Sequence, residues 1–404
     1  MRDTELFQAA LGLGTPWSVS GSRFDAAARR LDIEITFAKG ARFACPTCGA
    51  AGCPAYDTEP LTWRHLSFFQ HEAYLTARVP RVSCQACGIR QVSVPWARAG
   101  SGFTLLFEAF VMALVASMPV AVVARTVGEH DTKLWRVVHH YVEQARGRAD
   151  HGEVRRVAFD ETAARRGHNY VSLFVDLDRT RVLFVADGKD AATVGAFAAD
   201  LQEHGGDAAK VAEVCIDMSP AFIKGTAEHL PQAAITFDKF HAVKIVNDAV
   251  DQVRREEQPG RPELKRTRYA WLKNTTNLSS GQRDTVESLS RRNLKTARAW
   301  QIRLTFQEVY QQPSRQAAEA LLKRWYFWAT HSRLPPMIDA ARTIKRHWDG
   351  ILRWHDTHIA NGVLEGINSL VQAAKAKARG YRSTRNLKAI IYLIAGKLEL
   401  SLPT

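Results

Sequence analysis

The chain has 404 residues, of which 46% are hydrophobic and 24% are charged, a composition that excludes disordered and fibrous proteins. Its net charge of +14 and its pI near 9.7 favour a polyanionic partner, most often nucleic acid, although a basic surface can also serve solubility alone. Acidic residues near the N-terminus argue against a signal peptide. Glu108 and Pro119 interrupt the apolar stretch 103–124, so we expect two buried helices there and no membrane span.

Two Cys-x-x-Cys-Gly sequences predict a structural zinc site near the start of the chain. They read Cys45-Pro-Thr-Cys48-Gly49 and Cys84-Gln-Ala-Cys87-Gly88. Two intervening residues suit a tight turn whose sulfurs face one metal, and two such turns complete a tetrahedral four-sulfur site. We therefore expect residues 1–98 to contain a zinc ribbon with Zn²⁺ bound by Cys45, Cys48, Cys84 and Cys87. Four reduced thiols without a metal are the alternative.

The sequence around these cysteines predicts the strands of the ribbon. Residues 31–37, 63–69 and 73–79 have strand-like sequences, whereas the remainder of residues 1–40 carries no functional signal. Cys53 is interpreted as a spare thiol, although it has the chemistry to replace a ligand. Five arginines expected on the surface favour contact with phosphate: Arg42, Arg64, Arg78, Arg81 and Arg90.

Residues 99–150 predict a helix-turn-helix DNA-binding domain. A small residue at the helix contact (Ala124), a glycine in the turn (Gly128) and apolar anchors on the second helix (Leu134 and Val137) fit that motif. An ordinary helical hairpin is the alternative. The second helix is expected to present Thr132, Lys133 and Arg136 to DNA. Polar residues 147–153 are interpreted as a linker.

Residues 151–250 predict the first part of a catalytic domain. Three strands with short connections, at 154–159, 170–177 and 180–186, imply an antiparallel meander. A helix at 190–204 follows, and then strands at 211–216 and 233–237 that each precede a helix. This order gives a mixed five-stranded sheet of the RNase H-like type, in which Asp160 and Asp217 end neighbouring strands. Many strands end in aspartate simply as a turn residue, which is the alternative for Asp160 taken alone.

Residues 251–355 predict an all-helical insertion. They lack strand-like alternation and are rich in arginine, lysine and tryptophan. A basic helical block with aromatic residues suits DNA backbone and unpaired bases, but most of the tryptophans are expected in the core of the insertion.

Residues 356–404 predict the final helices of the catalytic domain. Glu365 lies in the first turns of a predicted helix, and no acidic residue follows it before Glu399. Glu365 has two interpretations. It is either a metal ligand beside a DNA-binding surface, or a glutamate whose charge interacts favourably with the helix dipole. The candidate DNA-binding residues of this basic run are Lys375, Arg379, Tyr381 and Arg382.

Several of these motifs, taken together and in order, resemble a known family. They are CPTCG with CQACG, FDETAARRGHNY, the run Asp217-Met-Ser-Pro-Ala-Phe, FDKFHAVKIVNDAVDQVRR, and NGVLEGIN followed by ARGYR. The chain resembles the bacterial DDE transposases of the insertion-sequence ISL-three family. This resemblance implies a zinc finger, a helix-turn-helix, an RNase H-like domain with a helical insertion, and a catalytic triad of Asp160, Asp217 and Glu365. Asp238 lies in a family motif but, by that resemblance, is not one of the three.

The implied chemistry is metal-dependent cleavage and strand transfer at the ends of an insertion sequence. Three carboxylates suit Mg²⁺ or Mn²⁺, and we expect Asp160 and Asp217 to share two ions about 4 Å apart, with Glu365 completing the second site. A water would cleave the transposon end, and the freed 3′-hydroxyl would attack target DNA. Supporting roles near the phosphates are expected for Glu161, His168, Lys239, His241, Asn361 and Asn368.

The expected partner is double-stranded DNA, both the terminal inverted repeats and the target, with the protein a homo-oligomer on DNA in the bacterial cytoplasm and nucleoid. Two other functions stay open at this point. One is a zinc-ribbon and helix-turn-helix regulator with an inactive catalytic domain, and the other is an RNase H-like nuclease without strand transfer.

Overall fold

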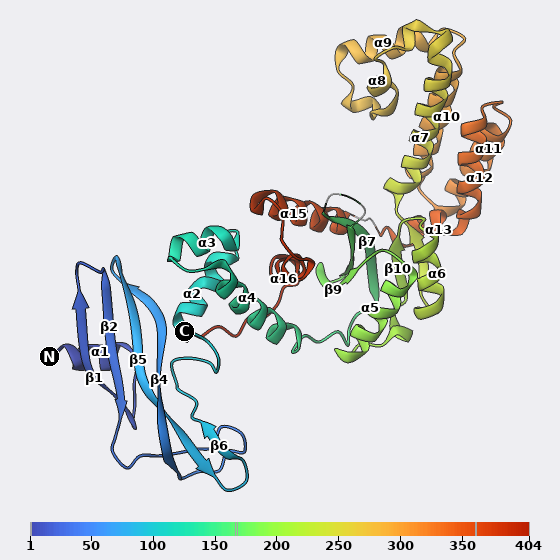
Figure 1. Cartoon of the computed structure of the whole chain (residues 1–404). Coiled ribbons are helices and arrows are strands. Elements are labelled where there is room, and N and C mark those ends of the chain that lie inside the picture. The colour runs from blue at the N-terminus through green and yellow to red at the C-terminus, as the bar shows by residue number, and fades with distance from the viewer. Residues whose placement is uncertain (1, 166, 168, 360–361, 404) are drawn as a thin grey trace. The chain divides into compact units, whose positions relative to one another are not determined.

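The computed structural model describes residues 2–165, 167, 169–359 and 362–403. The chain forms two compact units, one of Met1–Ala145 with Glu399–Thr404 and one of Arg146–Leu398 (Figure 1). The finer division into five segments stays a prediction. Within the described part of the chain, none of the helices combines the length and the apolar character that crossing a bilayer requires.

The first unit begins with a sheet in the order β1-β2-β5-β4-β3, and β6 pairs with β5. The longest strands, β4 and β5, form an antiparallel hairpin because every second residue of β5, from Ala73 to Val79, is buried. The predicted strands are confirmed, and residues 1–40 additionally supply a helix and a strand that their sequence did not predict. The elements are α1 (Asp3–Ala10), β1 (Trp17–Asp25), β2 (Arg30–Phe37), β3 (Arg42–Phe43), β4 (Cys53–Phe68), β5 (His71–Cys84) and β6 (Gly88–Gln91).

The predicted exposure of the ribbon arginines is wrong for Arg64. Its side chain is buried between the rings of Tyr74 and Phe107, and it donates hydrogen bonds to backbone carbonyls and to Ser67. Arg81 is half-buried and pairs with Asp57. An arginine in a strand covers apolar surface with its stem and meets the polar groups at the strand's edge, so sequence alone did not reveal its position.

Three helices complete the first unit and confirm the helix-turn-helix. They are α2 (Leu105–Val115), α3 (Val120–Val127) and α4 (Asp131–Arg146). Gly128 ends α3 in the left-handed region at φ 73°, and Leu134 and Val137 anchor α4 with no exposed surface. Glu108 is tolerated in apolar α2 because it accepts hydrogen bonds from Arg98 at 2.9 Å and Tyr141 at 3.0 Å.

The second unit is built on the predicted mixed sheet, in the order β11-β10-β7-β8-β9. The pairs β7–β8 and β8–β9 are antiparallel, whereas β10 is parallel to both β7 and β11. Helices α5 and α6 pack together, and stacked rings such as Phe174 on Phe197 fill the core beneath them. The elements are β7 (Arg156–Arg165), β8 (Asn169–Asp176), β9 (Arg181–Asp187), α5 (Ala191–Glu203), β10 (Glu213–Ile216), α6 (Pro220–His229) and β11 (Ala234–Phe237).

A helical block follows β11, as predicted. The long helix α7 packs on α8, α10 and α12 (Figure 1), and Trp271 and Trp325 are fully buried in this block. The spacing of Phe240, Val243, Val246 and Val250 predicts a single apolar face on α7, and this is wrong at Phe240, whose side chain is exposed. The helices are α7 (Lys239–Glu257), α8 (Arg268–Leu272), α9 (Ser280–Ser290), α10 (Lys295–Val309), α11 (Arg315–Thr330), α12 (Pro335–Arg346), α13 (Trp348–Leu352) and α14 (Trp354–Thr357).

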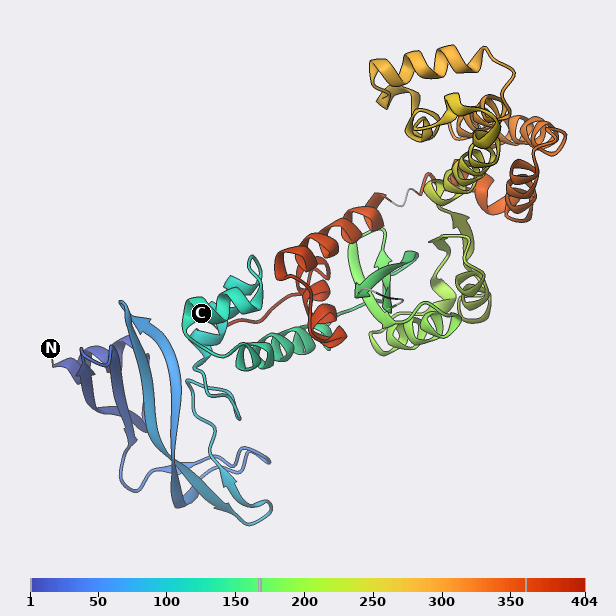
Figure 2. The same cartoon turned by 45° about the horizontal axis from the view of Figure 1, so that its top comes forward.

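The last two helices return to the sheet. Helix α15 (Gly362–Ala378) contacts β7, and α16 (Thr384–Ala395) contacts β9 (Figure 2). Tyr392 of α16 accepts a hydrogen bond from the backbone N–H of Val185 at 2.9 Å, so α16 satisfies part of the unpaired edge of β9. Residues from the end of the chain therefore reach β7, the first strand of this sheet in sequence order.

Candidate active site

Three aspartates lie at the same level of three neighbouring parallel strands. The register pairs Cys215 with Ala158, and Ile216 with Phe237. If the same register is extended beyond the last paired residues of β10, Asp217 lies opposite Asp160 on one side and opposite Asp238 on the other. The N–H of Asp238 donates to the carbonyl of Ile216 at 2.9 Å, which holds the third aspartate beside the second.

The prediction that the strand stops at Asp160 is wrong. Strand β7 continues to Arg165 because its antiparallel pairing with β8 continues to Arg165↔Asn169. Its parallel pairing with β10 ends earlier, at Ala158, so one edge of β7 is open at Asp160. Successive side chains alternate between faces, so Phe159 enters the core and Asp160 points to the opposite face of the sheet.

The site disfavours negative charge on its own carboxylates. Burial, with repulsion from Asp217 and Glu161, raises the pKa of Asp160 to about 6, although the N–H of Glu161 and nearby His241 act in the other direction. Burial also raises the pKa of Asp217, whose Oδ1 accepts a hydrogen bond from the N–H of Ser219 at 2.9 Å. A cation between the two side chains would offset both the burial and the repulsion.

Helix α15 lies along β7 (Figure 2), and a row of polar contacts joins the two. Asn368 Nδ2 donates to Asp160 Oδ2 at 3.3 Å, across 208 residues of sequence. One turn further, Gln372 Nε2 donates to Thr162 Oγ1 at 2.6 Å, and Lys375 donates to the carbonyl of Ala163. These contacts place the predicted Asn368 directly on the predicted Asp160.

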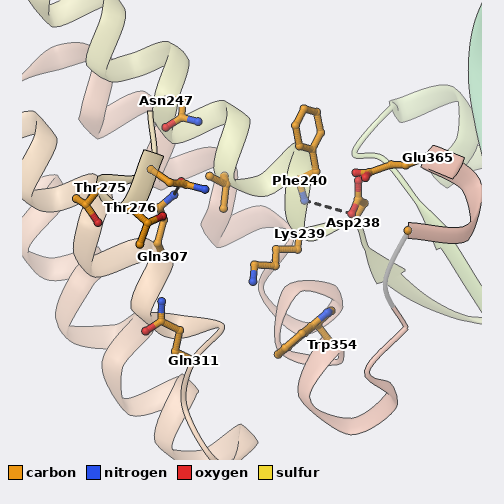
Figure 3. A pocket seen from close by; sticks show the side chains of 13 residues that line it. Asp238, Lys239, Phe240, Asn247, Thr275, Thr276, Gln307, Gln311, Trp354 and Glu365 are labelled. Carbon is orange, nitrogen blue, oxygen red and sulfur yellow. Dashed lines mark hydrogen bonds between the residues drawn. The ribbon is translucent and has the colours of Figure 1, made fainter. Parts of the chain in front are cut away.

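Glu365 lies one turn before Asn368 and is exposed. It lines a pocket of about 640 Å³ together with Asp238, Lys239 and Trp354 (Figure 3). The donor atoms of Asp160, Asp217 and Glu365 do not all lie within 4.8 Å of one another. The structure thus brings Asp160 and Asp217 together and places Glu365 in the adjoining pocket with Asp238.

Asp238 is a third acidic residue at this edge of the sheet, and no role was predicted for it from the sequence. Its side chain is 4% exposed, and its Oδ1 accepts the N–H of Phe240 at 3.2 Å as the N-cap of α7. Its Oδ2 is buried and has no hydrogen-bond partner among the described residues, and His241 Nε2 lies 3.8 Å away. The available signal was Asp-Lys-Phe-His directly after a predicted strand.

The other predicted supporting residues have separate positions. Glu161 pairs with Lys189 at 3.1 Å. The ammonium of Lys239 lies over the ring of Trp354, 5.4 Å from its centroid. His168 and Asn361 lie outside the described residues.

The candidate DNA-binding side chains lie on two surfaces. Thr132, Lys133 and Arg136 are exposed on α4, where Lys133 pairs with Glu129 at 2.9 Å. Arg379 and Arg382 are exposed at the turn between α15 and α16, Lys375 contacts β7 as described, and Tyr381 is half-buried. Their contact with DNA stays a prediction.

The four predicted zinc ligands converge. The sulfurs of Cys45, Cys48, Cys84 and Cys87 lie within 4.8 Å of one another, and Cys48 Sγ lies 3.6 Å from Cys84 Sγ. Backbone N–H groups of the first turn lower the pKa of Cys45 to about 6, whereas hydrogen bonding to the Cys48 sulfur, burial and the neighbouring sulfurs raise the pKa of Cys87 to about 12. Thiols this close ionise together only around a cation, which fits zinc. Cys53 is outside the group and donates to the carbonyl of Ala50 at 3.4 Å.

Comparisons with known proteins agree with this organisation. Residues 157–391 match the family model of the ISL3 transposase, described as "Transposase". The chain belongs to the ISL3 family of transposases. Residues 92–142 match the helix-turn-helix domain of ISL3 transposases, and residues 41–87 match the zinc finger of the transposases of IS204, IS1001, IS1096 and IS1165. The chain is therefore a DDE-type transposase, an enzyme of the polynucleotidyl transferase class.

Two curated relatives of this ISL3 family member cover most of its length. The transposase for insertion sequence element IS1557 from Mycobacterium tuberculosis is 27% identical over 100% of this chain and 98% of that protein. The transposase for insertion sequence element IS1001 from Bordetella parapertussis is 29% identical over 84% of this chain and 85% of that protein. The helix-turn-helix match and the transposase family imply that this ISL3 transposase binds DNA.

Proposed function

We propose that this transposase binds the terminal inverted repeats of its insertion sequence and performs Mg²⁺-dependent cleavage and strand transfer with Asp160, Asp217 and Glu365. The observation that carries the proposal is the alignment of Asp160 and Asp217 on adjacent parallel strands, with raised pKa values for both. Helix α15, which carries Glu365, docks on the same strand as Asp160.

The residues present fit a hard divalent cation. Carboxylate and amide oxygens are the donors that Mg²⁺ prefers, and Asp238 Oδ2 and Asn368 Oδ1 are buried without a hydrogen-bond partner among the described residues. Asp160 and Asp217 would hold the ion, and Glu365 would join them. Such an ion lowers the pKa of a bound water and offsets charge on a phosphate oxygen.

The protein's own groups position the reactants. Asn368 holds the carboxylate of Asp160 by donating to its Oδ2, which also favours the ionised form that binds a cation. His241 lies near all three aspartates and, when protonated, offers a cationic donor at Nε2. The basic turn at Arg379 and Arg382 is proposed to contact the DNA backbone.

The test separates cleavage from binding. Mg²⁺-dependent cleavage of DNA that carries the element's own ends should be abolished by each of Asp160→Asn, Asp217→Asn and Glu365→Gln, because each substitution removes a negatively charged metal ligand. Binding to the same DNA, measured by gel shift, should stay nearly unchanged. Exposed Asp339→Asn and Glu228→Gln serve as matched controls that keep both activities.

The outcomes also separate the rival functions. Cleavage that persists in one of the three variants removes that residue from the proposed set. DNA binding without any Mg²⁺-dependent nicking would identify a regulator, and cleavage without joining of the 3′-hydroxyl to target DNA would identify a nuclease. Sedimentation of the protein with and without end DNA tests the proposed assembly of several copies on DNA.

A further inference from the structure

A second cluster of metal-binding side chains lies in the catalytic unit, apart from the aspartates. Donor atoms of His151, Asp200 and His204 lie within 4.8 Å of one another. Asp200 and His204 are one turn apart at the end of α5, and His151 precedes β7. The predicted linker 147–153 is therefore partly buried, and its histidine packs on α5.

The imidazole ring of His151 is buried and stacks on the ring of His204. Its side chain is 3% exposed, and neither ring nitrogen has a hydrogen-bond partner among the described residues. A neutral imidazole carries one N–H donor and one acceptor, and leaving either unsatisfied in the interior is unfavourable. Backbone contact fixes the histidine in this place, because its N–H donates to the carbonyl of His204 at 2.8 Å. A metal ligand in this position would use the free nitrogen lone pair.

The other two side chains are arranged as metal ligands commonly are. One oxygen of Asp200 accepts a hydrogen bond from Arg146 at 2.5 Å, while the other is buried, has no hydrogen-bond partner among the described residues and lies 3.6 Å from Nδ1 of His204. Nδ1 of His204 lies 2.7 Å from the carbonyl of Asp200, so a proton held there leaves Nε2 as a lone pair. Outer contacts of this kind orient a carboxylate and select the tautomer of a histidine.

We infer that His151, Asp200 and His204 form a second zinc site, one that ties the segment entering β7 to the end of α5. Two imidazoles and one carboxylate suit zinc, with water as the fourth ligand. Zinc bonds of about 2.0–2.1 Å require donors roughly 3.3 Å apart, so the cluster must contract by about 1.5 Å at most. The rings of His151 and His204 are stacked with their centroids 4.9 Å apart, and rotation of these rings is the movement that the inferred site requires.

Charge near the cluster limits how tightly it holds the ion. Arg146 is the cation in direct contact with Asp200, so the ion would share that carboxylate's charge. Four thiolates carry more negative charge than two imidazoles and one carboxylate, so the four-cysteine site should retain zinc more strongly. A metal buffer should therefore remove the inferred zinc first.

The test is the zinc content of the full-length protein at fixed free zinc. The wild-type chain should bind two zinc ions, and His204→Gln and Asp200→Asn should each bind one. Asn keeps an oxygen for Arg146, so Asp200→Asn preserves that contact. His229→Gln, on α6 outside the cluster, is the matched control and should bind two.

Cobalt substitution identifies the ligands of the second ion. The difference between the spectra of cobalt-loaded wild type and His204→Gln should show ligand-field bands without thiolate charge transfer. One zinc per wild-type chain, or equal zinc in wild type and both variants, overturns the inference. If one variant aggregates, the wild-type stoichiometry and the other variant still decide.

Discussion

The four-cysteine centre and the aspartate site differ in what assembles them. The cysteines come from two short turns, and Cys48 and Cys84, which are 3.6 Å apart, are separated by 36 residues. The contact between Asp160 and Asn368 spans 208 residues and needs the whole sheet and a returning helix. Thiolates crowded at the end of a hairpin depend on their ion to stay together, whereas the aspartates are held by strands that pair without one. Folding of the first unit should therefore require zinc. The sheet of the second unit should form without metal, and its buried aspartates should destabilise it.

The largest expected effect follows from removing one zinc ligand. Cys45→Ser should lose one zinc per chain and destabilise the first unit by several kcal/mol, because structural zinc contributes roughly 10–16 kcal/mol of binding free energy in zinc-finger peptides. Metal analysis and hydrogen exchange measure both effects, with fast exchange expected in β4 and β5 and unchanged exchange in β7 and β10.

Cys53→Ser is the matched control for that variant, because Cys53 is a buried thiol outside the group of four. It should keep its zinc. Slow exchange in β4 and β5 after the Cys45→Ser substitution would show that the hairpin stands without its ion, and the contrast between the two centres would fail.

The sequence predicted the cysteine centre almost completely because its information is local. Spacing, the following glycines and the flanking strands are all visible within a few residues of each ligand. The order of strands and helices likewise predicted the five-stranded sheet and the neighbouring positions of Asp160 and Asp217.

The parts that were missed depend on tertiary structure. The length of β7 is set by its pairing with β8, which no pattern inside β7 reveals, so the strand was expected to stop at Asp160. Asp238 was read as a motif residue alone, because its buried, unpaired oxygen appears only when α7 and its neighbours are packed. His151 looked like part of a linker because its burial comes from contact with α5.

The second prediction tests whether the aspartate site strains the fold without metal. Asp160 has a pKa of about 6 in the folded protein, against an ordinary value of 3.8 that applies when the chain is unfolded. Between these pH values the folded protein therefore binds a proton at Asp160 that the unfolded chain does not. Stability of the metal-free protein should therefore fall as pH rises from about 4 to 6 and stay low above it. Asp160→Asn should weaken this dependence without abolishing it, because Asp217 also has a raised pKa, and it should stabilise the metal-free protein at pH 8 by about 1–3 kcal/mol.

Urea unfolding of the second unit at several pH values, with and without Mg²⁺, measures this effect. Mg²⁺ should stabilise the wild type at pH 8 and not the variant, and Asp339→Asn should behave like the wild type. A metal-free protein that gains stability between pH 4 and 6 through Asp160 would reverse the sign and contradict the raised pKa.

The third prediction asks whether Asp238 serves only as a helix cap. Asp238→Asn keeps an oxygen for the N–H of Phe240, and asparagine caps helices about as well as aspartate, so stability should change by about 0.5 kcal/mol or less. Loss of its charge beside His241 should slow end cleavage about tenfold, equivalent to roughly 1.4 kcal/mol. Single-turnover cleavage and thermal unfolding of the same preparation separate the two roles, and full activity would reduce Asp238 to a cap.

The smallest effect is expected at Asn368, which acts on Asp160 through one hydrogen bond. A neutral donor stabilises an ionised carboxylate by a modest amount, so Asn368→Ala should raise the apparent pKa of Asp160 by about half a unit. The acid limb of the pH profile for cleavage should move to higher pH by that amount, with the rate nearly restored at pH 8.

Two neighbours on α15 distinguish this positioning role from simple docking of the helix. Ser369 is exposed, so Ser369→Ala should leave the pH profile and the stability unchanged. Gln372→Ala removes the contact with Thr162, so it should weaken the packing of α15 on β7 without shifting the pH profile. If Asn368→Ala and Gln372→Ala lower the rate equally at every pH, α15 acts on the site only by packing. A shift confined to Asn368→Ala instead shows that a side chain 208 residues away sets the charge of Asp160.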